Sequence, residues 1–84
     1  MCVMRCIVLL FAQARELAGC ERFVVDLPES AAVADAMEVI ERQHPQLALL
    51  RNRLAIALDQ RYAPPHAQLH EGCTIALIPP VSGG

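Results

Sequence analysis

The stretch that decides the fold is Thr74-Ile75-Ala76-Leu77-Ile78-Pro79-Pro80-Val81-Ser82-Gly83-Gly84. Its first five residues are typical of a strand, which stops at two prolines because proline cannot donate to a sheet ladder. The remaining six residues predict an extended arm of about 20 Å with the carboxylate of Gly84 at its tip. An arm ending in two glycines can enter a channel too narrow for other residues. The alternative is an ordinary unstructured terminus, which the Pro-Pro-Val segment disfavours because a flexible linker is normally rich in glycine and serine over a longer stretch.

The first third of the chain predicts two strands joined by a short helical connection. Residues 3–11 are almost continuously apolar, which indicates a central strand covered on both faces. Helix-forming residues 12–18 close on Gly19, a common helix stop. Apolar and polar side chains then alternate over residues 23–27, as in a half-buried strand, and this strand ends at Pro28.

One main helix is predicted after Ser30, which can serve as its N-cap, and it ends before Pro45. The apolar side of this helix consists of Val33, Ala36, Met37, Ile40 and His44. Residues 54–58 indicate a third strand, and a tight turn at Asp59-Gln60 leads into residues 61–63, an edge strand limited by Pro64. Residues 73–78 form the last strand.

This order predicts the α+β class, with a mixed sheet of about five strands gripping one helix. Residues 1–78 are expected to form the domain and residues 79–84 the tail. Because the first and last strands are both strongly apolar, we expect them side by side and parallel at the centre of the sheet. Phe11 and Ile78 would then meet beside the root of the tail, where an apolar patch could bind a partner.

Composition narrows the possible partners. Eighty-four residues suffice for one small domain, and a hydrophobic content of 55% is high enough to leave apolar surface for another protein. The net charge of −2 offers no basic stripe for nucleic acid. No apolar run approaches the length of a membrane span, and residues 1–12 contain Arg5 and lead into charged sequence in place of a signal-peptide cleavage site. A cytoplasmic protein is expected.

Candidate catalytic and metal-binding residues are sparse. The four cysteines, at positions 2, 6, 20 and 73, are too scattered for a metal motif, and Cys6 and Cys73 are expected to be buried free thiols. His66 and His70 have the spacing of a helical metal pair, but the flanking prolines and Gly72 indicate a solvated loop. We therefore predict no metal site and no active site within the chain itself.

The motif Leu-Phe-Ala-Gln-Ala-Arg-Glu-Leu-Ala-Gly at residues 10–19, together with Gly72 and the ending at residues 78–84, resembles the small, sulfur-carrier subunit of molybdopterin synthase. The resemblance covers the whole chain and implies the β-grasp, ubiquitin-like fold. Pro-Pro-Val-Ser-Gly-Gly is specific within this family, whereas Gly-Gly alone also ends thiamine-pathway carriers and processed protein modifiers. Asp59, where the family often has Asn, and residues 71–73, where it has Asp-Gly-Asp, depart from the pattern at turns.

The resemblance also implies a chemistry. An ATP-dependent activating enzyme would adenylate the carboxylate of Gly84, and a sulfur donor would convert the adenylate to a thiocarboxylate. The arm would then enter the large synthase subunit and donate sulfur to cyclic pyranopterin monophosphate, forming the dithiolene of molybdopterin. Gly84 would carry the sulfur, while the channel would hold the remaining tail residues: Pro79, Pro80, Val81, Ser82 and Gly83. The implied assembly contains two small and two large subunits, and the chain itself binds no cofactor.

Two alternatives remain open at this point. The same fold and ending suit a sulfur carrier for thiamine, cysteine or tRNA thiolation, or a modifier joined to target lysines. A different class of protein would use an exposed Cys20 or Cys73 for redox or persulfide chemistry, but no neighbouring cation or helix start is evident in the sequence to activate either thiol.

Overall fold

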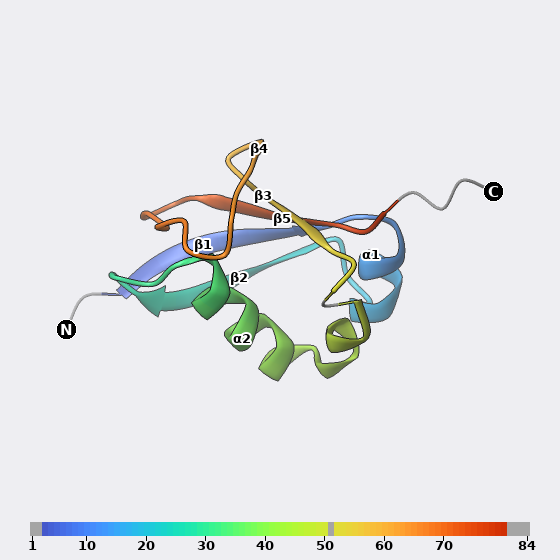
Figure 1. Cartoon of the computed structure of the whole chain (residues 1–84). Coiled ribbons are helices and arrows are strands. Elements are labelled where there is room, and N and C mark those ends of the chain that lie inside the picture. Colours follow the sequence, from blue (N-terminus) through green and yellow to red (C-terminus); the bar gives the residue numbers. More distant parts are fainter. Residues whose placement is uncertain (1–2, 51, 81–84) are drawn as a thin grey trace.

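The computed structural model describes residues 3–50 and 52–80. In chain order, its elements are β1 (Val3–Leu10), α1 (Ala12–Ala18), β2 (Arg22–Pro28), α2 (Val33–Gln43), the 3-10 helix η1 (Pro45–Leu50), β3 (Ala55–Leu58), β4 (Arg61–Tyr62) and β5 (Thr74–Ile78). Figure 1 shows one twisted sheet with α2 lying across it and α1 at the end where β5 finishes.

The strands form one mixed sheet in the order β2-β1-β5-β3-β4. The first and last strands, β1 and β5, are parallel neighbours at its centre, with Ile7 opposite Thr74 and Leu10 opposite Leu77. The other pairings are antiparallel. The predicted β-grasp architecture is therefore confirmed, including the central parallel pair.

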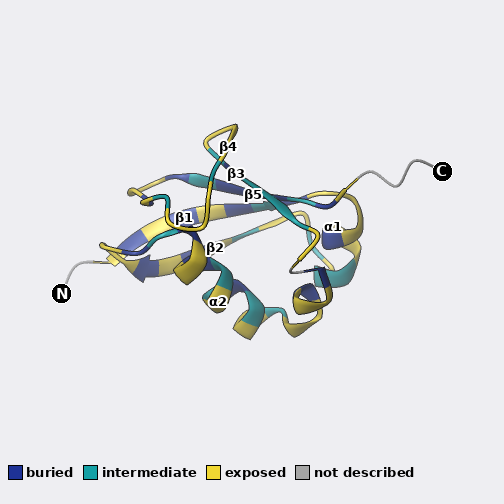
Figure 2. Cartoon of the chain, viewed as in Figure 1, coloured by how far each residue is buried: buried dark blue, intermediate teal, exposed yellow. Residues whose placement is uncertain are grey.

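The core lies between the sheet and the helices. On β1, every second side chain points to the helix side, and Met4, Cys6, Val8 and Leu10 are all buried. The buried residues facing them are Val25 and Leu27 of β2, Ile75 and Leu77 of β5, and Val33, Ala36 and Ile40 of α2. Buried residues alternate with exposed or half-buried residues along β1, as Figure 2 shows.

The prediction that β1 is covered on both faces was wrong. Val3 is 66% exposed and Ile7 is 37% exposed, because they point away from the helices. Val24 on the neighbouring strand β2 is likewise exposed. The helices cover one side of the sheet, so the second set of apolar side chains on β1 forms an open face.

The prediction that Ser30 caps α2 was also wrong. The helix begins later, with Ala32 as its N-cap residue, and Ala32 has no side-chain acceptor. Its own N–H donates to Oδ2 of Asp35 at 2.9 Å, and the N–H of Val33 donates to the carbonyl of Ala67 at 3.0 Å. A distant loop therefore supplies an acceptor that a cap side chain would otherwise provide.

Candidate functional site

The root of the C-terminal tail is held beside the start of α1. The N–H of Phe11 donates to the carbonyl of Leu77 at 3.4 Å, and after Ile78 the chain continues through a buried Pro79 and an exposed Pro80. The predicted tail residues Val81, Ser82, Gly83 and Gly84 lie outside the described residues. The structure places Pro79 and Pro80, the first two residues of the tail, at the end of the sheet where β5 finishes.

Beside this root lies an apolar surface, which we call the open-face patch and define as Ile7, Leu9, Phe11, Tyr62, Ala76 and Ile78. Most of these side chains line one cavity of about 580 Å³ with Ala57, Asp59, Gln60 and Thr74. Phe11 is 46% exposed and Tyr62 is 76% exposed, although both are large and hydrophobic. Ile7 is also exposed, Leu9 and Ile78 are half-buried, and Ala76 is buried. Exposed large apolar side chains on one face are typical of a protein-binding surface.

Phe11 and Ile78, the two residues predicted to form a partner interface, are brought together. Leu10 lies opposite Leu77 in the parallel pair, so the next residue of each strand reaches the same end of the sheet. Both Phe11 and Ile78 line the same cavity, with Phe11 exposed and Ile78 half-buried. Their role in binding a partner stays a prediction.

Sequence reasoning missed the other members of the open-face patch. Leu9 and Ala76 are opposite one another in the β1–β5 register, and Tyr62 reaches the same face through its pairing with Ala57. The signal for Leu9 was present, since it alternates with Ile7 and Phe11 along the first strand. Tyr62 and Ala76 could be placed only once the strand order was known.

A polar pair lies at the rim of the patch. Asp59 Oδ1 accepts a hydrogen bond from the Thr74 N–H at 2.9 Å, and Asp59 Oδ2 lies 2.5 Å from Nε2 of His70. The Thr74 N–H and the His70 hydrogen bond lower the pKa of Asp59. Asp59 and the carbonyl of Glu71 raise the pKa of His70. His70 is therefore in an exposed loop, as predicted. Its contact with Asp59 links this loop to the β3–β4 turn.

We expect this pair to make stability depend on pH. His70 has a folded pKa above its ordinary value of 6.5, so its contribution is present below pH 6.5 and is lost as pH rises through the folded pKa. Asp59 has a folded pKa below 3.8, so its contribution is present above pH 3.8 and is lost as pH falls through the folded pKa. The pair therefore stabilises the fold most between pH 3.8 and pH 6.5, the ordinary pKa values of the two groups.

The measurement is urea unfolding of the wild type and of His70→Gln across the neutral range. The stability advantage of the wild type should shrink as pH rises, and it should be small throughout because both side chains are exposed. His66→Gln is the matched control, since it removes a histidine from the same loop and keeps the pair. A wild-type advantage over His70→Gln that is unchanged with pH would contradict the assignment.

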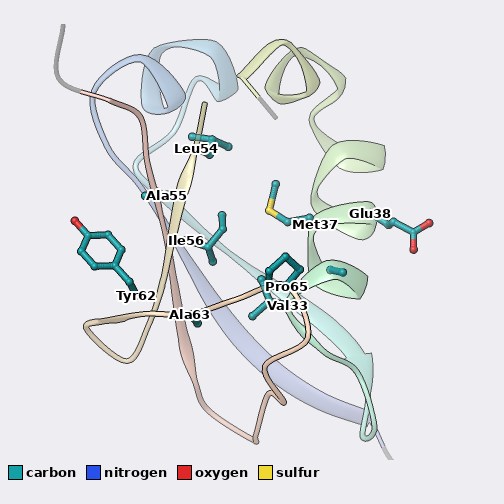
Figure 3. Close-up of a pocket in the computed structure, with 10 residues that line it drawn as sticks. Val33, Met37, Glu38, Leu54, Ala55, Ile56, Tyr62, Ala63 and Pro65 are labelled. Carbon is teal, nitrogen blue, oxygen red and sulfur yellow. The ribbon is translucent and has the colours of Figure 1, made fainter. Parts of the chain in front are cut away.

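A second, larger cavity of about 750 Å³ lies between α2 and the β3–β4 edge. Met37 from α2 and Ile56 from β3 point toward one another across it, whereas Glu38 points away from it (Figure 3). Nearly all of its lining side chains are apolar, including Val33, Leu54 and others from the same elements. Its lining contains no cysteine or histidine, and its polar side chains are those of Glu38 and Tyr62.

The three cysteines within residues 3–80 are all at least partly buried. Cys6 and Cys73 are wholly buried, as expected, and Cys20 is half-buried. The alternative that used an exposed Cys73 for redox or persulfide chemistry is therefore contradicted for that residue. Over residues 3–50 and 52–80, no three metal-binding side chains cluster, and no helix has the length and apolar character to cross a bilayer.

Comparison with known proteins gives the family. Residues 8–84 match the model of the ThiS family. The human molybdopterin synthase sulfur carrier subunit is 36% identical, over 92% of this chain and 91% of that protein. The relative from Chlamydomonas reinhardtii with the same name is 37% identical, over 92% of this chain and 95% of that protein.

Solved structures share the fold. The small archaeal modifier protein 1 of Haloferax volcanii has a TM-score of 0.86 at 26% identity, covering 93% of this chain and 99% of that chain. A complex of subunits 1 and 2 of the Helicobacter pylori molybdopterin-converting factor contains a chain with a TM-score of 0.69 at 24% identity, covering 96% and 100%. With the family model and the curated relatives agreeing over nearly its whole length, the chain belongs to the ThiS family of sulfur carriers related to the molybdopterin synthase small subunit.

Proposed function

We propose that the chain is the sulfur carrier subunit of molybdopterin synthase, and that Gly84 is its working residue. In this proposal Gly84 is adenylated, converted to a thiocarboxylate, and donates its sulfur to cyclic pyranopterin monophosphate. The observation that carries the proposal is the parallel β1–β5 pair, which starts the Pro79-Pro80 segment beside an exposed apolar patch. The pathway is inferred from the relatives, which are named as molybdopterin synthase sulfur carrier subunits.

The chemistry explains why an activating enzyme is needed. A free carboxylate is a poor electrophile, so ATP supplies AMP as a leaving group on Gly84. A sulfur donor displaces AMP, and the resulting thiocarboxylate presents a nucleophilic sulfur. A dithiolene contains two sulfur atoms, so each product molecule consumes two loaded carriers. ATP is consumed by the activating enzyme, and the carrier binds no cofactor of its own.

The open-face patch provides a docking surface for the large subunit. A partner that covers Phe11 and Ile78 contacts the sheet directly beside the root of the tail. Docking therefore fixes the starting point of the tail, and Pro79 and Pro80 limit its initial direction because their φ angles are restricted. Val81, Ser82 and Gly83 would extend the tail through the channel to the substrate.

The proposed assembly has two small and two large subunits and operates in the cytoplasm. Its second partner is the ATP-dependent adenylating enzyme, which must contact the same tail at a different time. The proposal involves neither nucleic acid nor a membrane.

The proposal is tested by the intact mass of the chain after incubation with its activating enzyme, ATP and a sulfur donor. We expect the mass to rise by the difference between a sulfur and an oxygen atom, with the change located at Gly84. A chain that keeps its original mass while the activating enzyme consumes ATP would contradict the thiocarboxylate step.

The second candidate is a protein modifier or a carrier for another pathway, such as thiamine, cysteine or tRNA thiolation. The observation in its favour is the close fold similarity to small archaeal modifier protein 1. Covalent adducts of Gly84 with lysines of other proteins, found by mass spectrometry of cell extracts, would distinguish a modifier from a carrier.

A further inference from the structure

Two buried thiols face one another on the helix side of the sheet. The Sγ atoms of Cys6 and Cys73 are 3.0 Å apart, and both residues are 0% exposed. Cys6 lies on β1, and Cys73 directly precedes β5. The Ile7 N–H donates to the carbonyl of Cys73 at 2.9 Å, which extends the parallel β1–β5 pairing to these two positions. The proposed function uses neither thiol.

The parallel pairing of β1 with β5 is expected to give the two backbones the spacing of a disulfide. Neighbouring strands lie about 4.8 Å apart, within the range of about 4.4 to 6.8 Å between the Cα atoms of disulfide-bonded cysteines. Both side chains point to the same side of the sheet, since both are buried in the core. Bond formation therefore requires a small side-chain adjustment and no change in strand register.

We propose that Cys6 and Cys73 form an intramolecular disulfide when the protein meets a small-molecule disulfide oxidant. In the first step, one protein thiolate attacks the oxidant, breaks its S–S bond, releases one small thiol and forms a mixed disulfide. In the second step, the other protein thiolate attacks the protein sulfur of that mixed disulfide and releases the second small thiol. The two cysteines lose two electrons and two protons, and the oxidant is reduced to two thiols.

Burial makes the reaction slow in both directions. Burial away from water is the main cause that raises the pKa of Cys6 to about 12, and the neighbouring Cys73 thiol is the second cause. Little Cys6 thiolate therefore exists in the folded protein. Oxidation therefore proceeds through transient opening of the core, in which an oxidant reaches one sulfur. The same burial shields the finished disulfide from external reductants.

The crosslink would join residues 67 positions apart and so enclose most of the domain. Restricting the unfolded chain in this way raises the melting temperature. The open-face patch lies on the other side of the sheet, so the disulfide should leave partner binding unchanged. The inference is independent of the proposed function.

The experiment uses the full chain, unfolded and refolded in a buffer of oxidised and reduced glutathione so that both thiols are reached. We expect an intact mass lower by two hydrogen atoms and a peptide map that links Cys6 to Cys73. The melting temperature of the oxidised protein should exceed that of the reduced protein by about 10 °C or more. Cys20→Ala is the matched control and should form the same disulfide.

Several outcomes would overturn the inference. One is a folded product in which Cys6 and Cys73 both remain reduced at every glutathione ratio. Another is a product in which either residue stays as a glutathione adduct or pairs with Cys2 or Cys20. A Cys6–Cys73 disulfide that lowers the melting temperature would refute the claim that the native spacing accommodates it.

Discussion

Deleting Gly84 is expected to abolish sulfur transfer while leaving the domain folded. The deletion moves the reactive carbon back by about 3.3 Å, and a transfer reaction depends on alignment at a finer scale than this. Adding one residue after Gly84 should have the same effect, because the sulfur would then be attached to a different carbon. The fold should survive because the hydrophobic core consists of residues between Met4 and Leu77.

The measurement compares formation of the sulfurated pterin by each variant with the large subunit present. Melting temperature and affinity for the large subunit serve as controls, and both should match the wild type. Gly83→Leu should fail in the same assay, since a bulky side chain would not enter a channel shaped for glycine. Full activity of the deletion or the extension would show that the terminal carboxyl is not the working group.

Phe11→Ala should weaken binding to the large subunit by about thirtyfold, or about 2 kcal/mol, as expected for an aromatic anchor in an interface. Ile78→Asp should weaken binding further, because it places an unpaired charge in the docked surface. Both side chains line the cavity beside the root of the tail. Leu49→Ala is the matched control: Leu49 is 75% exposed on η1, outside the patch, and its loss should leave affinity unchanged.

Affinity and melting temperature must be measured on the same variants. Phe11 is 46% exposed, so its truncation should cost little stability. Ile78 is half-buried, so Ile78→Asp is interpreted only through the affinity of its folded fraction. A large loss of stability with unchanged affinity would show that these side chains serve the core and not a partner.

The order of the elements along the chain and the central parallel pair could be predicted, because both follow from the pattern of apolar residues along the chain. Apolar runs with strand-forming residues at residues 3–11 and 74–78, separated by one amphipathic helix, favour few arrangements. The open face could not be predicted in the same way. A continuous apolar run has the same appearance whether its second face is covered by a helix or by another protein, so Ile7 was assigned to a covered strand.

Several contacts between side chains or loops that are distant in the sequence could not be predicted. The acceptor for the Val33 N–H comes from Ala67, and no local signal indicates this. Asp59 and His70 meet only because β3 and β5 are neighbours, whereas the prolines and Gly72 around His70 indicated no more than a solvated loop. Burial of Cys6 and Cys73 was foreseen from their strand contexts, but their contact required the parallel register.

The central claim is that Gly84 carries the sulfur that becomes part of molybdopterin. The most direct test follows the intact mass of the chain through one cycle, with an isotopically labelled sulfur donor. The chain should gain labelled sulfur with the activating enzyme and ATP. It should return to its original mass when the large subunit and cyclic pyranopterin monophosphate are added, with the label in the dithiolene. A loaded chain that keeps its label in the presence of both, or passes it to a different acceptor, would show that Gly84 does not supply the dithiolene sulfur.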